Sequence, residues 1–224
     1  MISSLMHGLE VELHTRGFAH VPGPIDVDAY RRLAVALGRI VGEESIALRP
    51  GAHAYVAKPG PVPLHTDHPE VDLVAWRCEE QDDVDGASLL FDARALVEGL
   101  SEGQRELLRQ VELVCPPLSG GPPTLRFPVL RPDRTGDAIF CSPWLKSANA
   151  IPEHEDGLEY FRGRLSAEAK RSSVNVLLAL GDALFVDNHR VLHGRRAIAD
   201  ASRRRLHRLW IARAGRVSFE GVRP

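Results

Sequence analysis

The stretch that decides the fold is SVNVLLALGDALFVDNHRVLHGRRAIADASRRRLHRLWIA, residues 173–212. Its apolar runs are short, rich in branched residues and interrupted by turn formers, which is typical of strands rather than helices. We predict strands at 173–180, 183–186 and 203–212, with a turn at Gly181-Asp182. The polar motif DNHRVLHGR, residues 187–195, lies between the last two of these strands.

The same alternation of short strands and punctuating residues extends toward the N-terminus. Further strands are predicted at 17–21, 72–78 and 87–91, and helices at the N-terminus and over 26–41, 93–111 and 153–170. In the helix over 26–41 the expected apolar face consists of Ala29, Leu33, Val35, Leu37, Ile40 and Val41. Because the strands dominate the centre, we predict a β-sandwich or barrel with flanking helices, not an alternating βαβ sheet.

Residues 116–132, PPLSGGPPTLRFPVLRP, contain six prolines and two adjacent glycines. Proline cannot donate to a sheet ladder, so this segment is predicted to be a loop or an edge. It is long enough to form a lid over a site, although a plain surface connection fits equally well.

Composition limits the classes of protein. The 224 residues predict a single domain over 1–224, and 28 Lys and Arg against 30 Asp and Glu argue against a nucleic-acid partner. Three scattered cysteines fit a reducing cytoplasmic location rather than a disulfide scaffold. No apolar run approaches the length of a membrane span, so no membrane partner is expected, and the start of the chain lacks the features of a signal peptide.

A metal site is predicted from His65, Asp67 and His193. His65 and Asp67 are two residues apart, and such residues project from the same face of an extended strand. His193, 126 residues after Asp67, is the best third ligand because it lies in another β-rich stretch. Two histidines and one carboxylate leave three positions of an octahedron open, which is the arrangement of non-haem Fe(II) enzymes that activate O₂.

Strand alternation predicts which side chains of residues 203–212 share a face. If this segment is a strand, Arg204, Leu206, Arg208 and Trp210 share one face, and Arg204 and Arg208 lie ~13 Å apart. A buried guanidinium needs a carboxylate partner, which a dicarboxylate co-substrate would supply. A solvated basic strand is the alternative.

These motifs together resemble the taurine dioxygenase (TauD/TfdA-like) branch of the Fe(II)/2-oxoglutarate-dependent oxygenases. The segment DNHRVLHGR is especially similar to the γ-butyrobetaine hydroxylase-type form of the distal-histidine motif. The resemblance covers about residues 15–212 and is strongest at 63–92 and 173–211. It implies an all-β core with flanking helices, folded as a double-stranded β-helix (jelly-roll). It also implies Fe(II) as cofactor, with 2-oxoglutarate and O₂ as co-substrates.

Carried over residue by residue, the resemblance makes His65, Asp67 and His193 the catalytic iron ligands. Arg204, eleven residues after His193, matches the arginine that binds the distal carboxylate of 2-oxoglutarate. Ser88 stands where the family usually has a threonine that assists this arginine. Arg208 matches a position that holds the acidic group of the substrate in several relatives. An aspartate at 67, rather than the small residue of related halogenases, implies hydroxylation or another oxidation.

The expected substrate is a small molecule with an anionic group, most simply a free amino acid or an amino-acid derivative of specialised metabolism. The chain is short for this family and so has little lid. His68, Tyr55 and Trp144 are further candidates for contact with the substrate, each weighed against plain packing. The sequence does not predict the oligomeric state.

Three alternatives remain at this point. A related oxygenase acting on a small sulfonate or another organic acid is the nearest. The segment His65-Thr66-Asp67-His68 also partly matches an H-x-H-x-D-H zinc hydrolase motif, but Pro63 stands at the first histidine. A non-catalytic jelly-roll binding domain is the third.

Overall fold

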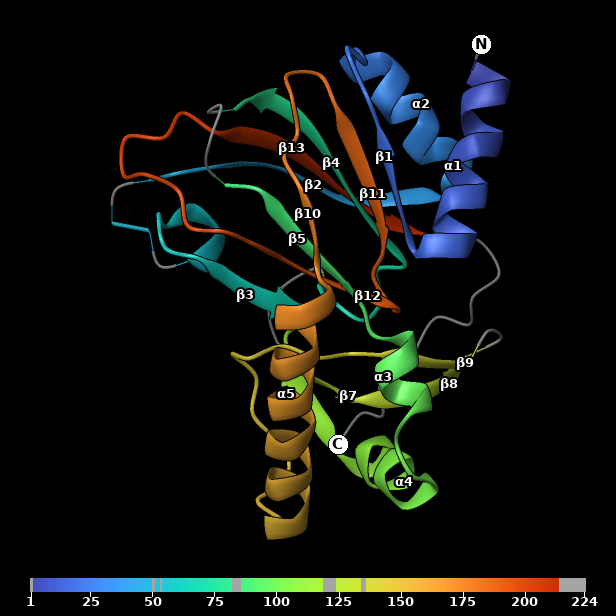
Figure 1. Cartoon of the computed structure of the whole chain (residues 1–224), viewed down its shortest axis with the longest axis vertical. Coiled ribbons are helices and arrows are strands. Elements are labelled where there is room, and N and C mark those ends of the chain that lie inside the picture. Colours follow the sequence, from blue (N-terminus) through green and yellow to red (C-terminus); the bar gives the residue numbers. More distant parts are fainter. Residues whose placement is uncertain are drawn as a thin grey trace.

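In a computed structural model of the chain, two antiparallel sheets lie face to face and helices flank them (Figure 1). The structure describes residues 2–49, 51–52, 54–81, 86–118, 124–133 and 136–213. The larger sheet has the order β1-β11-β4-β13-β2 and the smaller β10-β5-β12-β3. The strands of the larger sheet are β1 (Phe18–Val21), β11 (Ala183–Asp187), β4 (Leu73–Glu80), β13 (Arg205–Ala212) and β2 (Arg39–Ala47). Those of the smaller sheet are β10 (Val174–Val176), β5 (Ser88–Asp92), β12 (Val191–Arg195) and β3 (Val62–His65). The expected jelly-roll core with flanking helices is confirmed.

The side chains of β13 alternate between two apolar clusters, one between the sheets and one on the outer face of the larger sheet. Leu206 belongs to the apolar cluster between the sheets and Trp210 packs against it, whereas Leu209 and Ile211 belong to the cluster on the outer face. Successive side chains of a strand point to opposite faces, so the predicted parity of this segment is confirmed. Arg208 therefore points into the space between the sheets with Leu206.

Two helices cover the outer face of the larger sheet: α1 (Ile2–Arg16) and α2 (Val27–Leu37). Asp26 caps α2 by accepting a hydrogen bond from the Ala29 N–H. The predicted apolar face of α2 is partly wrong. Val35 is 62% exposed, and Tyr30 and Ala34 are buried in its place, as a period of 3.6 residues requires. Residues 40 and 41, predicted in the helix, belong to β2.

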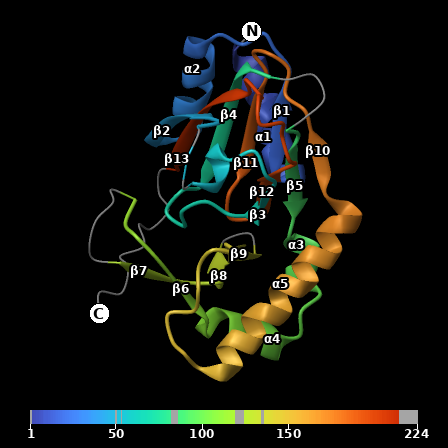
Figure 2. The same ribbon diagram turned by 90° about the vertical axis from the view of Figure 1, so that its left-hand side faces the viewer.

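A third layer lies beyond the smaller sheet (Figure 2). It contains α3 (Arg94–Glu98), α4 (Glu102–Gln110), α5 (Pro152–Ser172) and the strands β6 (Glu112–Cys115), β7 (Leu125–Pro128), β8 (Leu130–Asp133) and β9 (Gly136–Ile139). The single helix predicted over 93–111 is in fact two helices. Ser101 and Gln104 form a capping box that starts α4 anew after Gly99.

The described parts of the proline-rich segment 116–132 include short edge strands, as the prolines predict. β7 pairs with β6, and β8 with β9, in separate two-stranded sheets, and residues 119–123 lie outside the described residues. The strand predicted at 173–180 is also shorter than expected, because only β10 pairs before the chain crosses to the larger sheet. Within the described part of the chain, no helix combines the length and apolarity that a bilayer crossing requires.

Candidate metal and co-substrate site

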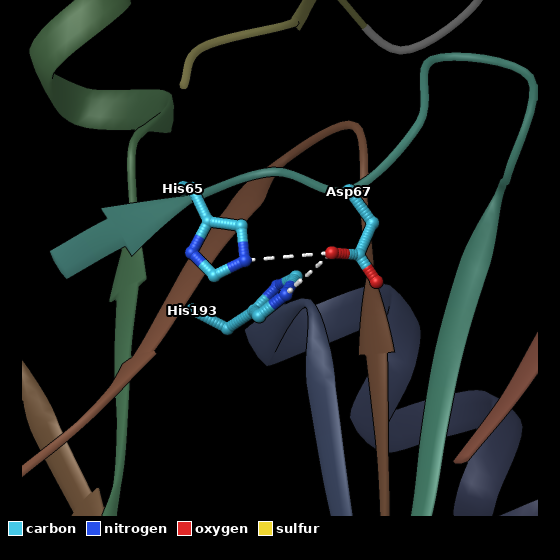
Figure 3. Close-up of side chains that lie close together, drawn as sticks. All are labelled: His65, Asp67 and His193. Atoms are coloured by element: carbon cyan, nitrogen blue, oxygen red, sulfur yellow. Dashed lines mark ion pairs between the residues drawn. The ribbon is translucent and has the colours of Figure 1, made fainter. Parts of the chain in front are cut away.

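The register of the smaller sheet brings two histidines together. His193 on β12 lies directly opposite His65 at the end of β3. Asp67 follows two residues after His65, beyond the end of the strand, so it is placed by the turn rather than by strand alternation as expected. The three side chains point toward one another (Figure 3).

The ligand-type atoms of His65, Asp67 and His193 all lie within 4.8 Å of one another, and the three side chains are buried. Oδ1 of Asp67 is 3.4 Å from Nε2 of His65 and 3.4 Å from Nε2 of His193. Burial alone would raise the pKa of Asp67, but the interaction with the adjacent His193 and His65 outweighs it, and the pKa lies well below its usual range. Burial also lowers the pKa of His193. These directions favour an ionised Asp67 and a neutral His193, the protonation states in which such side chains bind metals.

Hydrogen bonding at the two histidines tests whether this group suits a cation. Nδ1 of His65 donates to the carbonyl oxygen of Pro63 at 2.9 Å, which leaves the lone pair of Nε2 facing the carboxylate of Asp67. Both ring nitrogens of His193 are buried without a hydrogen-bond partner among the described residues. A lone pair opposite a carboxylate is repulsive unless a cation lies between them. The donor set and its geometry therefore fit a divalent metal ion.

Asn188, at the start of the distal motif, fixes the turn that carries Asp67. Its Oδ1 accepts from the Asp67 N–H at 2.7 Å, and its Nδ2 donates to the carbonyl oxygens of His68 and Val71. Asn188 is fully buried. Asn188 is five residues before His193 in the chain and thus links the distal motif to the turn that carries Asp67.

Two side chains of β13 hold the outer oxygen of Asp67. Oδ2 accepts from the indole Nε1–H of Trp210 at 2.7 Å and from the guanidinium of Arg208 at 3.0 Å. Arg208 also pairs with Glu44, its direct neighbour on β2. Burial lowers the pKa of Arg208 to about 10, which leaves it charged at neutral pH.

An inner cavity of about 50 Å³ lies between the sheets beside the histidines. Arg204, only 6% exposed, and Ser88 both line it, as do His65 and His193. Nε of Arg204 donates to Oε1 of Gln81 at 3.1 Å. The arginine and the serine expected to share one task thus lie at one cavity, and Arg204 is not turned into bulk water.

An outer cavity of about 300 Å³ is lined by His65 and Asp67. Each of the four residues predicted to contact substrate, Tyr55, His68, Trp144 and Arg208, lines it. Tyr55 stacks on Trp144 with centroids 4.9 Å apart, and Trp144 meets the ring of His65 edge-on. Nε2 of His68 donates to the Pro116 carbonyl and its Nδ1 accepts from the Glu70 N–H, so both its nitrogens are engaged.

Arg195 ties the wall of the outer cavity to β12. It is two residues after His193, is buried, and donates to the carbonyl oxygens of Val56 (3.0 Å) and Gly60 (2.7 Å). Tyr55 begins the short 3₁₀ turn η1 (Tyr55–Ala57), so this arginine anchors the segment that carries Tyr55. Arg195 lies in the distal motif and Trp210 on the face predicted for Arg204 and Arg208, but no role at the site was predicted for either of them or for Glu44.

A jelly-roll with two histidines and one aspartate converging at a cavity defines an oxygenase of the mononuclear metal class. The chain belongs to the taurine catabolism dioxygenase TauD, TfdA family, whose model matches residues 3–210. This assignment confirms the family expected from the motifs and makes the protein a dioxygenase. A comparison with curated proteins finds no significant match.

Solved structures share the fold at low sequence identity. An asparagine oxygenase in complex with Fe(II), 2S,3S-3-hydroxyasparagine and succinate superimposes with a TM-score of 0.74 at 17% identity, over 94% of this chain and 79% of that one. A variant of the non-heme iron oxygenase OrfP in complex with (3S)-hydroxy-L-Arg gives 0.72 at 18% identity, over 93% and 80%. PvcB from Pseudomonas aeruginosa gives 0.65 at 19% identity, over 92% and 79%.

Proposed function

We propose that the protein is an Fe(II)- and 2-oxoglutarate-dependent dioxygenase that hydroxylates an unactivated C–H bond of a free amino acid or a close derivative. The observation that carries the proposal is the position of the buried His65, Asp67 and His193 group between two cavities. One cavity is lined by the arginine expected for the co-substrate and the other by aromatic side chains.

In this proposal His65, Asp67 and His193 hold Fe(II). The metal would supply O₂ activation coupled to the oxidation of 2-oxoglutarate to succinate and CO₂. The chain keeps the pKa of Asp67 low and, by burial, lowers the pKa of His193, and it fixes the His65 tautomer through Pro63. Trp76 and Trp144 pack edge-on against His193 and His65 and limit the access of water to the ligands.

Arg204 and Ser88 would bind the distal carboxylate of 2-oxoglutarate in the inner cavity. A guanidinium matches a carboxylate with a bidentate pair of charge-assisted hydrogen bonds. Arg204 is inward-facing on the edge of the apolar core, where such a pair is little screened by solvent. The serine hydroxyl adds a donor without a further charge.

The substrate would bind in the outer cavity against Tyr55, Trp144 and His68. Its volume of about 300 Å³ suits a molecule of amino-acid size. Solved relatives hold hydroxyasparagine and hydroxy-L-arginine, which supports an amino-acid substrate here. Because both nitrogens of His68 are engaged, it would contribute ring surface rather than a hydrogen bond.

Arg208 would bind the acidic group of the substrate by releasing Glu44. Its guanidinium is held by Asp67 and Glu44, and it is only 8% exposed. The side chain of Glu44 is 48% exposed, so it can move into solvent, whereas that of Asp67 is buried. A substrate carboxylate would therefore take the place of Glu44 on Arg208 and leave the contact with Asp67 intact.

The test is a screen of the twenty amino acids for succinate formation that depends on Fe(II), 2-oxoglutarate and substrate, followed by mass spectrometry. The expected result is one amino acid that triggers turnover and gains one oxygen, with no product from Asp67→Ala. Turnover with sulfonates or other organic acids alone would retain the enzyme class and reject the amino-acid substrate. Hydrolysis with zinc, or no metal binding, would reject the oxygenase.

We also propose a single domain and a cytoplasmic location for the protein. Residues 1–224 would form one domain, which the shared core supports because residues from Phe18 to Leu206 meet in it. The protein would work in a reducing cytoplasm, which fits three cysteines that are all buried and free.

A further inference from the structure

The two carboxylate oxygens of Asp67 have different surroundings. Oδ1 faces the two histidines at 3.4 Å each. Oδ2 faces away and accepts hydrogen bonds from Trp210 and Arg208. The two donors differ in kind, because Arg208 has a second acidic partner in Glu44 whereas Trp210 donates through a single N–H.

Trp210 is fixed in its place by the neighbouring strand. Gly42 lies opposite it on β2, and a β-carbon built at Gly42 would lie 2.6 Å from Cε3 of the indole ring. Only glycine therefore allows the ring to lie this close to β2. The guanidinium of Arg208 covers the indole at 4.5 Å from the ring centroid. The register of β13 against β2 shifts immediately after Trp210.

We infer that Trp210, seated on Gly42, is a positioning residue that restrains the carboxylate of Asp67 so that Oδ1 alone is offered to the metal. A carboxylate free to rotate can bind a metal through both oxygens and occupy two positions. With Oδ2 held by the indole N–H, one more position stays free for the co-substrates. This inference rests on the proposed function, because it assumes that Asp67 is a metal ligand.

Arg208 and Trp210 differ in whether they can stay bound to Oδ2 of Asp67 during turnover. Arg208 is proposed to exchange Glu44 for the substrate, so its guanidinium is expected to shift during turnover. The indole N–H has no second acceptor among the described residues. It can therefore hold Oδ2 whether or not substrate is bound.

The test measures metal binding and carboxylate geometry in the full-length protein, with Co(II) as the probe. Trp210→Phe keeps most of the ring and removes the N–H. We expect Co(II) affinity to fall about 10- to 100-fold, the range for loss of an outer-shell partner. In infrared difference spectra taken on Co(II) addition, the separation of the two carboxylate stretches is expected to narrow, as it does when one bound oxygen becomes two.

Gly42→Ala is the second variant, because it retains the N–H but displaces the ring. It is expected to change affinity and spectrum in the same direction as Trp210→Phe. Trp76→Phe is the control, since Trp76 meets His193 edge-on but makes no hydrogen bond to Asp67 among the described contacts. Its carboxylate spectrum should match the wild type.

Each outcome decides the inference. Wild-type affinity and an unchanged carboxylate spectrum in folded Trp210→Phe, or in folded Gly42→Ala, would overturn it while leaving the proposed function in place. The same spectral change in Trp76→Phe would also overturn it, because any loss of an aromatic ring would then suffice. Failure of the wild type to bind Co(II) or Fe(II) would reject the proposed function and the inference together.

Discussion

The inner and outer cavities share His65 and Arg208 but are built differently. The inner cavity is walled mostly by the paired strands of the two sheets, and Arg204 lies there directly before β13. The outer cavity is walled by η1, by the turn after β3 and by the segment around Trp144, and Tyr55 is 49% exposed there. In the proposed function, the sheets would therefore set the co-substrate and metal chemistry, whereas loops would set the choice of substrate.

The largest effect is expected from a change to the proposed metal ligands, which lie where the two cavities meet. Asp67→Ala removes the carboxylate that faces both histidines, so we expect loss of Fe(II) binding and a fall in substrate oxidation well beyond the ~100-fold cost of an outer-shell partner. Metal content and succinate formation measure the two effects. Full turnover by this variant would remove Asp67 from the site. Glu43→Gln, on the outward face of β2, is the matched control.

A large effect confined to the inner cavity is expected from Arg204→Ala. Loss of a charge-assisted pair worth roughly 1.5–3 kcal/mol raises the KM for 2-oxoglutarate about 10- to 150-fold. The amino-acid KM should change much less. Arg203→Ala is the control, because the neighbouring Arg203 side chain is 81% exposed. An unchanged 2-oxoglutarate KM in Arg204→Ala would assign the role to another residue.

A smaller effect, on stability rather than on either cavity, is expected at Asp182 in the turn before β11. Its carboxylate accepts from the N–H groups of Gly23 and Ala179 and pairs with His20. Burial alone would raise the pKa of Asp182, but these hydrogen bonds outweigh it, and the pKa is lowered. The stabilisation is therefore present above the ordinary carboxyl pKa of about 4 and is lost as the pH falls further.

We expect Asp182→Asn to lower the free energy of unfolding by about 1–3 kcal/mol at neutral pH. Urea unfolding of both proteins should show this difference shrinking as the solution is acidified. The 2-oxoglutarate KM should stay at the wild-type value. A stability difference that grows on acidification would contradict the assigned direction of the pKa.

The smallest effect is expected at the rim of the outer cavity. Tyr55→Leu removes the stack on Trp144, and an aromatic pair contributes about 0.5–1.5 kcal/mol, which corresponds to a rise of roughly 2- to 12-fold in the amino-acid KM. The 2-oxoglutarate KM should not change. An equal rise in both KM values would show that the two cavities do not divide the work as proposed.

Sequence reasoning succeeded where one strand or one motif carries the information. The parity of 203–212 placed Arg204 and Arg208 on the interior face, and the family motifs identified the dioxygenase class. It was less successful at two helices. The break between α3 and α4 depends on a local capping box that the prediction missed, and the exposure of Val35 depends on which face of α2 meets the sheet.

The residues around Asp67 show what a single sequence does not contain. The pairing of β13 with β2 makes Glu44 a neighbour of Arg208, 164 residues away in the chain. Trp210 meets Asp67 across 143 residues, in the turn after β3. Asn188 reaches Asp67 across 121 residues. Nothing in the local pattern of these residues distinguishes them from core or surface positions, since tertiary contacts alone give them their partners.

The anchoring of η1 by Arg195 has a consequence for redesign. The guanidinium of Arg195 donates to the backbone carbonyl oxygens of Val56 and Gly60 and not to side chains. The side chains along this segment can therefore be changed while the path of its backbone is retained. A library that randomises Tyr55 and its exposed neighbours, with Arg195 left untouched, would explore new substrates on an unchanged catalytic frame.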